Sequence, residues 1–338
     1  MISKVFSDQL DACYAVARLQ HENDDYLLVA SEVDGACFAY DLNNHLQKEV
    51  VWQSTGGTMS IVQIPGTMDF LATQRFYPGF KAQDCQLVYA CFQQGKWQLT
   101  TIADFPYLHR FDLIQDKGGQ MLFVGCTIAN SKSFTEDWSD KGRVFVANYD
   151  RESHALNELR QLPFQLTKNH GYYAVKDKGY SLITGVEGVV KLTYPDYSES
   201  GDWDYELIFE EETSDIVQID INQDGFVENA IIQGFHGNHF RLLTQDFSKE
   251  IYHHPNLTPF GHSLWSGKLL GKNFMVFGWR AGQADLIVLT WKNDQLVSTA
   301  VDERGGSSNV LAFEKNNKAY LFSANNGRGE VALYELTI

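Results

Sequence analysis

Three histidines stand at equivalent positions in segments that resemble one another. They are His109 in HRFDLIQ, His170 in HGYYAVK and His262 in HSLWSGK, and the matching position of DIVQIDI holds Asp215. A histidine near its ordinary pKa can remove or deliver a proton at neutral pH. Imidazole nitrogens and a carboxylate are also ligands for zinc, manganese or iron. These residue types therefore allow either general acid–base chemistry or a divalent metal site.

Basic and aromatic side chains occur in several of these segments, in the loops between the second and third predicted strands. Arginine binds carboxylates through a fork of N–H donors, and aromatic rings can stack on the apolar face of a sugar ring. We therefore predict a small anionic ligand, such as a sugar acid, at a site shared with the histidines. The candidate residues in these loops are Arg75, Tyr77, Trp138, His236, Arg280 and Arg328.

The elements that must position these residues repeat seven times along the chain. Each segment reads as an alternating strand, a more apolar strand, a third strand and, in six cases, a polar outer strand. Successive segments start 45 to 61 residues apart, at Cys13, Met59, His109, His170, Asp215, His262 and Asn309. A repeat of about 40–50 residues containing several short strands is typical of propeller blades. The sequence predicts an all-β, seven-bladed β-propeller of four-stranded blades. The resemblance to propellers implies that the equivalent first positions encircle one mouth of the central channel.

The seventh segment ends with its third strand, so one strand is missing. Residues Ile2–Phe6 precede the first segment and belong to no other. We predict that this N-terminal strand completes the last blade and closes the ring, which leaves no exposed sheet edge. Residues 1–338 would then form a single domain. Two unrelated β domains are the alternative, which leaves the common period unexplained.

Composition limits the classes of partner. The chain has 27 Lys and Arg against 43 Asp and Glu, a net charge of −16, which argues against nucleic acid or an anionic membrane surface. It contains no apolar run long enough to span a bilayer and does not begin like a secretory signal. The five cysteines are an odd number without CxxC spacing, which favours free thiols in a reducing cytoplasm. We therefore predict a cytoplasmic protein.

A second candidate site is the segment Asp220–Glu228, which reads D-x-N-x-D-G-x-x-E. Oxygen ligands at alternate positions followed by a glycine are how a short loop wraps calcium. Because Ile231 stands at the twelfth position, the segment is not an EF-hand. It resembles the calcium loops of FG-GAP and VCBS-type propeller repeats, which join the first and second strands of a blade. The resemblance implies a structural calcium held by Asp220, Asn222, Asp224 and Glu228; a tight turn without metal is the alternative.

Two classes of function follow from these observations. The composition of the predicted mouth is similar to that of propeller polysaccharide lyases acting on uronates, such as ulvan and oligogalacturonate lyases. This resemblance implies β-elimination, in which Arg75 or Arg280 neutralises the carboxylate and His109 or His170 removes the neighbouring proton. Tyr77 would then protonate the leaving oxygen.

The other class is a non-catalytic propeller that senses a ligand or binds a protein. Propellers host many unrelated functions, so the fold does not favour either class. In this case the long loop Asn130–Gly142 would be the contact element, and the aligned histidines would be incidental.

Overall fold

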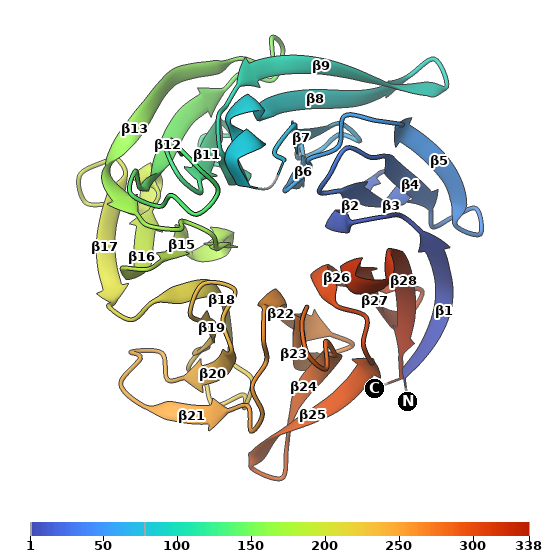
Figure 1. Cartoon of the computed structure of the whole chain (residues 1–338), viewed down its shortest axis with the longest axis vertical. Coiled ribbons are helices and arrows are strands. Elements are labelled where there is room, and N and C mark those ends of the chain that lie inside the picture. Colours follow the sequence, from blue (N-terminus) through green and yellow to red (C-terminus); the bar gives the residue numbers. More distant parts are fainter. Residues whose placement is uncertain (1, 78, 338) are drawn as a thin grey trace. The chain divides into compact units, whose positions relative to one another are not determined.

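The computed structural model describes residues 2–77 and 79–337. The chain is an all-β, seven-bladed β-propeller of four-stranded antiparallel blades, as the sequence predicts (Figure 1). Within the described residues there is no α-helix, and the four helical segments are short 3-10 turns. They are η1 (Gly79–Asp84), η2 (Lys176–Lys178), η3 (Pro195–Tyr197) and η4 (Asn326–Arg328).

The strands follow the predicted order, from the first strand of each blade to its outer strand. Blade 1 contains β2 (Cys13–His21), β3 (Asp24–Ser31), β4 (Cys37–Asp41) and β5 (Gln47–Trp52). Blade 2 contains β6 (Ile61–Gln63), β7 (Phe70–Gln74), β8 (Gln86–Gln93) and β9 (Lys96–Asp104). Blade 3 contains β10 (Leu108–Gln115), β11 (Met121–Thr127), β12 (Gly142–Tyr149) and β13 (Leu156–Leu166). Blade 4 contains β14 (Tyr172–Val175), β15 (Tyr180–Gly185), β16 (Gly188–Thr193) and β17 (Asp204–Phe209).

The remaining three blades complete the series. Blade 5 contains β18 (Thr213–Ile219), β19 (Glu228–Gln233), β20 (His239–Leu243) and β21 (Glu250–His253). Blade 6 contains β22 (Gly261–Leu269), β23 (Lys272–Trp279), β24 (Leu286–Lys292) and β25 (Gln295–Asp302). Blade 7 contains β26 (Ser307–Lys315), β27 (Lys318–Asn325), β28 (Glu330–Leu336) and β1 (Ile2–Gln9).

The chain divides into two compact units. The first unit comprises residues 1–16 and 213–338, and the second comprises residues 17–212. The first unit therefore holds blades 5, 6 and 7, the second holds blades 2, 3 and 4, and the division falls inside β2 of blade 1. The single domain expected for residues 1–338 stays a prediction.

The N-terminal strand completes the last blade, as predicted. Strand β1 pairs antiparallel with β28, with Ile2 opposite Leu336 and Gln9 opposite Glu330 (Figure 1). It is three residues longer than the predicted Ile2–Phe6 segment. The ammonium group of Lys4 in β1 lies 3.0 Å from the carboxylate of Asp302 and 2.9 Å from that of Glu330. Ion pairs therefore join β1 to the rest of this blade in addition to the backbone ladder.

Burial follows the strand order within each blade. Every residue of β7 and of β11 is buried, whereas the outer strands β9 and β17 are mostly exposed. A continuous apolar strand is expected where both faces are covered, and an alternating or polar one where only one face is covered. In the second unit, for example, Val124 and Val144 of blade 3 belong to one cluster with Ile183 and Leu192 of blade 4.

All five cysteines are buried free thiols. Among the described residues, no helix is long and apolar enough to cross a membrane.

Candidate functional site

The three aligned histidines are buried. His109 is in β10, His170 lies two residues before β14 and His262 is in β22, so each stands near the start of the first strand of its blade. Only 3%, 1% and 2% of their respective surfaces are exposed. Because a proton acceptor must reach its substrate, the hydrogen bonds of these rings decide what chemistry remains open to them.

His262 belongs to a Tyr–His pair in the first unit. Its Nδ1 lies 2.5 Å from the carbonyl oxygen of Ser308, and its Nε2 lies 3.3 Å from the hydroxyl of Tyr14. A carbonyl only accepts hydrogen bonds, so Nδ1 carries a proton, and in the neutral ring Nε2 accepts one from the tyrosine hydroxyl. The one basic nitrogen of His262 therefore faces a buried phenol.

An aromatic cluster surrounds this pair in the first unit. The ring centroid of His236 lies 5.3 Å from that of His262 and 4.4 Å from that of Phe260. The guanidinium carbon of Arg280 lies 4.9 Å from the centroid of Phe260, and the group donates a 2.7 Å hydrogen bond to Oδ1 of Asn326. The structure thus brings together three of the predicted site residues, His236, His262 and Arg280.

The loop that carries His236 depends on a glycine. His236 has a positive φ of 48°, and its backbone N–H donates to the hydroxyl of Ser214. A Cβ atom at Gly237 would lie 1.5 Å from the carbonyl oxygen of Gln233. Only glycine therefore allows the chain to turn back so closely behind the His236 ring.

His109 and His170 lie side by side in the second unit. Their ring centroids are 4.7 Å apart, and Nδ1 of His109 lies 3.2 Å from the carbonyl oxygen of His170. The ring of Phe76 also packs against His109, with 5.4 Å between the two ring centroids. As in His262, the contact with a carbonyl assigns the Nδ1 proton of His109 to a structural hydrogen bond.

Other side chains repeat this pattern at the starts of the first strands. In the second unit, the hydroxyl of Ser60 donates to the carbonyl of His109 at 3.0 Å, and Arg110 donates to the carbonyl of Met59 at 2.8 Å. In the first unit, the hydroxyl of Ser308 donates to the carbonyl of Cys13 at 2.8 Å. Side-chain donors thus satisfy backbone carbonyls of the neighbouring blade, which buried polar groups require.

Arg328 and Asp215 form local contacts. The guanidinium of Arg328 lies 2.7 Å from carboxylate oxygens of both Asp302 and Glu330, so it belongs to the ion cluster that also contains Lys4. The carboxylate of Asp215 accepts a hydrogen bond from the N–H of Ile216. The ligand-binding roles predicted for these residues stay predictions.

Arg75 and Tyr77 flank Phe76 in the second unit. Arg75 is exposed, has a positive φ of 60° and donates its backbone N–H to the carbonyl of Gly56. Burial and the nearby carboxylate of Asp34 raise the pKa of Tyr77. The phenol is therefore protonated at neutral pH, which is the form that an acid catalyst needs.

Trp138 lies in a loop of the second unit that is braced by its own side chains. We call residues Asn130–Gly142 the blade 3 loop. The carboxylate of Asp140 accepts hydrogen bonds from the side chains of Asn130, at 2.8 Å, and Ser131, at 2.7 Å. The ammonium of Lys132 donates to the carbonyl of Thr135 and lies 3.2 Å from the ring centroid of Trp138.

Asp137 fixes the other half of the blade 3 loop. It accepts hydrogen bonds from the hydroxyl of Ser139 and from the backbone N–H groups of Ser139 and Ser133, which lower its pKa to about 2. Between these contacts, Phe134 is 62% exposed. The loop therefore holds a large apolar ring in solvent on a backbone that is already ordered.

The segment Asp220–Glu228 connects β18 to β19, the first and second strands of blade 5. Asp220 accepts hydrogen bonds from the N–H groups of Asp224 and Gly225, and the side chain of Asn222 bonds with that of Asp224. Glu228 is buried and accepts the N–H of Ile221. Burial, and then the charges of Asp224 and Asp220, raise the pKa of Glu228. These hydrogen bonds are those of a tight turn, and the described carboxylates of the segment do not converge on one point, so calcium binding here stays a prediction.

Comparison with known proteins identifies the fold. No family model and no curated protein match the sequence. Among solved structures, the Cps50 (Swd1) β-propeller domain of Myceliophteria thermophila superposes with a TM-score of 0.60 at 10% identity over the full length of both chains. The Dos1 propeller superposes with a TM-score of 0.57 at 9% identity, over 92% of this chain and 75% of that one. At these identities the similarity shows the propeller fold alone.

Sequence reasoning missed the aromatic partners of the histidines. Tyr14 directly follows Cys13, the aligned position of blade 1, and Phe260 precedes His262 by two residues. Their closeness to the aligned positions is the only signal that the sequence offers for them.

Proposed function

We propose that this chain is a non-catalytic propeller that binds a partner protein through the blade 3 loop, with Phe134 as the apolar anchor. The observation that carries the proposal is the long loop Asn130–Gly142 itself, which Asp137 and Asp140 brace and which leaves 62% of the Phe134 surface exposed. Interface energy concentrates in a few large side chains that fill pockets on the partner. A loop that is ordered before binding loses less conformational entropy when the complex forms.

The hydrogen bonds of the histidines support the same conclusion. His109 and His262 are buried and use Nδ1 on backbone carbonyls. Nε2 of His262 faces the hydroxyl of Tyr14. These contacts are what buried polar side chains need for stability, and they require no substrate.

The negative charge near Phe134 indicates which charges the partner carries. Glu136, two residues after the anchor, is exposed. The low pKa of Asp137 keeps its carboxylate ionised at neutral pH, and the whole chain has a net charge of −16. Complementary charge speeds association and selects among partners. The partner we infer has an apolar pocket for Phe134 with lysine or arginine side chains at its rim.

Affinity capture from an extract of the source cells tests this proposal. Phe226 supplies the matched control, because it is also an exposed loop phenylalanine, with 67% of its surface exposed. We expect Phe134→Ala to reduce the yield of the captured partner about tenfold or more, as removal of an interface anchor does. Phe226→Ala should retain the partner, and equal capture by both variants would contradict the proposal.

Action on a sugar acid is the second candidate function, and the Tyr14–His262 pair is the observation that favours it. A phenol held against the basic nitrogen of an imidazole is a suitable acid–base pair. The test is incubation with uronate oligosaccharides, followed by the ultraviolet absorbance of the conjugated double bond that β-elimination forms. Absorbance that rises with the unaltered chain and is lost in both Tyr14→Phe and His262→Ala would assign a lyase; no rise excludes it.

A further inference from the structure

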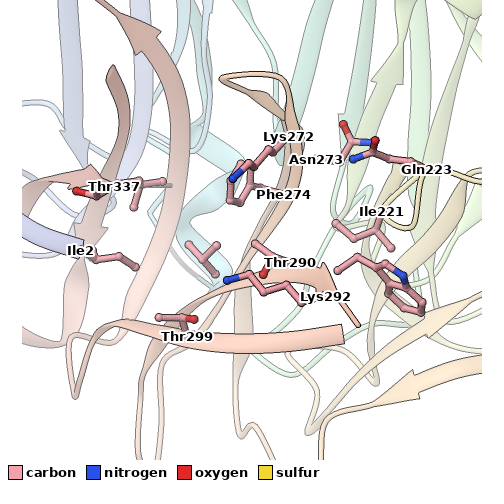
Figure 2. A pocket seen from close by; sticks show the side chains of 13 residues that line it. Ile2, Ile221, Gln223, Lys272, Asn273, Phe274, Thr290, Lys292, Thr299 and Thr337 are labelled. Atoms are coloured by element: carbon pink, nitrogen blue, oxygen red, sulfur yellow. The ribbon is translucent and has the colours of Figure 1, made fainter. Parts of the chain in front are cut away.

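The first unit contains a cavity that lies apart from the histidines. Its volume is about 400 Å³, within the range of small-molecule pockets. Strands β23, β24 and β25 of blade 6, the ends of β1 and β28 and the Asp220–Glu228 loop form its walls. In Figure 2, Ile2 and Thr337 lie on one side of the pocket and Ile221 and Gln223 on the other, with Lys272, Phe274, Thr290 and Lys292 between them.

The walls combine apolar side chains with neutral polar groups and lysines. Apolar side chains come from three blades: Ile2, Ile221, Phe274, Val288, Trp291 and Leu336. The hydroxyls of Thr290 and Thr299 and the amides of Gln223 and Asn273 also line the cavity. No aspartate or glutamate is among the lining residues that the structure describes. A bound molecule would therefore meet apolar surface, hydroxyl and amide groups and two lysines, without a carboxylate among the described lining residues.

Two lysines give the pocket a positive charge. Lys272 and Lys292 both line it, and neither forms an ion pair with a described residue. In a chain of charge −16, two unpaired ammonium groups at one cavity without a carboxylate are a local reversal of charge, which attracts an anion.

We propose that this cavity binds a small organic anion whose apolar body rests against Phe274 and Trp291 and whose charged group is held by Lys272 and Lys292. Lysine acts as a point charge rather than a planar fork. A compact oxyanion with several acceptors, such as a phosphate ester or a sulfonate, therefore suits the pair. The proposal is independent of the blade 3 loop and of the histidines.

Fluorescence titration with 1-anilinonaphthalene-8-sulfonate, an aromatic sulfonate, tests this site. The unaltered protein should bind the dye with an affinity that falls as salt is added. The variant K272A/K292A should bind it about tenfold or more weakly, because both positive charges at the cavity are removed. The matched control is K96A/K249A, which removes two exposed lysines outside the lining and changes the net charge equally.

Two further measurements separate the charge from the apolar wall. Phenyl phosphate should displace the dye, while benzyl alcohol, which has a similar ring and no charge, should not do so at the same concentration. Thr299→Trp, at an exposed position of β25, should fill the cavity and weaken dye binding. Equal affinities in the two double-lysine variants, equal displacement by the two competitors, unchanged binding by Thr299→Trp or no binding to the unaltered protein would each overturn the proposal.

Discussion

Lys4→Ala tests how β1 is held in blade 7. The substitution removes two charge-assisted hydrogen bonds, of 3.0 Å to Asp302 and 2.9 Å to Glu330. Such a bond to a buried partner contributes about 1.5–3 kcal/mol. The Lys4 side chain is 35% exposed, however, and Arg328 still neutralises both carboxylates. We therefore expect the free energy of unfolding to fall by about 1–2 kcal/mol at pH 7, as measured by urea denaturation.

The effect of Lys4→Ala should depend on pH. Burial opposes ionisation of Asp302, but hydrogen bonds from Arg328, Tyr334 and Lys4 outweigh it and lower the pKa. The pKa of Glu330 is lowered in the same way. A carboxylate with a lowered pKa stabilises the fold above its unfolded pKa of about 4, and this contribution is lost as the pH falls through the folded pKa. The difference between Lys4→Ala and the unaltered protein should therefore be constant from pH 8 to about pH 5 and shrink below pH 4.

Lys318→Ala is the control for this prediction. Lys318 pairs with Glu335 at 2.9 Å in the same blade, but it joins β27 to β28 and is 53% exposed. We expect a much smaller change than for Lys4→Ala, because solvent screens an exposed pair. Equal losses in the two variants, or a loss in Lys4→Ala that persists undiminished at pH 3, would refute the role assigned to the Lys4 cluster.

Three further predictions concern other parts of the chain. His262→Ala should lower the free energy of unfolding by about 3 kcal/mol in urea denaturation, since it leaves a cavity and removes two buried hydrogen bonds; His262→Asn should lose less, and equal losses would contradict the structural role of the ring. Chelation of calcium should lower the melting temperature of the unaltered protein but not that of Asp224→Ala, whereas no effect in either would contradict calcium binding by the Asp220–Glu228 loop. The thiols should resist a maleimide reagent until the protein is unfolded, because they are buried and burial raises the pKa of Cys37 in particular; rapid labelling of the folded protein would contradict this.

The sequence predicts the blades well because their signal is local and repeated. Apolar runs such as β11 are recognisable without knowledge of their neighbours, since both faces of a middle strand are covered. The closing strand is predictable by elimination, because blade 7 lacks a fourth strand at its own end and Ile2–Phe6 is spare. The ion cluster around Lys4 is not predictable, because it joins residues as far apart as Lys4 and Glu330, 326 positions along the chain.

The candidate site is harder to predict than the fold. The sequence predicts that His109 and His170 are neighbours, because they occupy equivalent places in adjacent blades. It does not predict that Nδ1 of His109 forms a hydrogen bond with the carbonyl of His170, because that contact depends on the orientation of the backbone in the neighbouring blade. Tyr14 and His262 are 248 residues apart, so their pairing requires the folded first unit. The sequence predicts that Arg328 binds a ligand, because it stands in a loop with other candidate residues. In the structure its guanidinium forms an ion pair with Asp302 at the end of blade 6.

Photo-crosslinking from residue 134 tests the central claim most directly. A benzophenone amino acid replaces Phe134 in one protein and Phe226 in another, and both are irradiated in an extract of the source cells. Because both positions are exposed, with 62% and 67% of their surfaces accessible, chance collisions should label them alike. We predict one discrete cross-linked product from position 134 that is absent from position 226. The same product from both positions, or none from position 134, would contradict a binding role for the blade 3 loop.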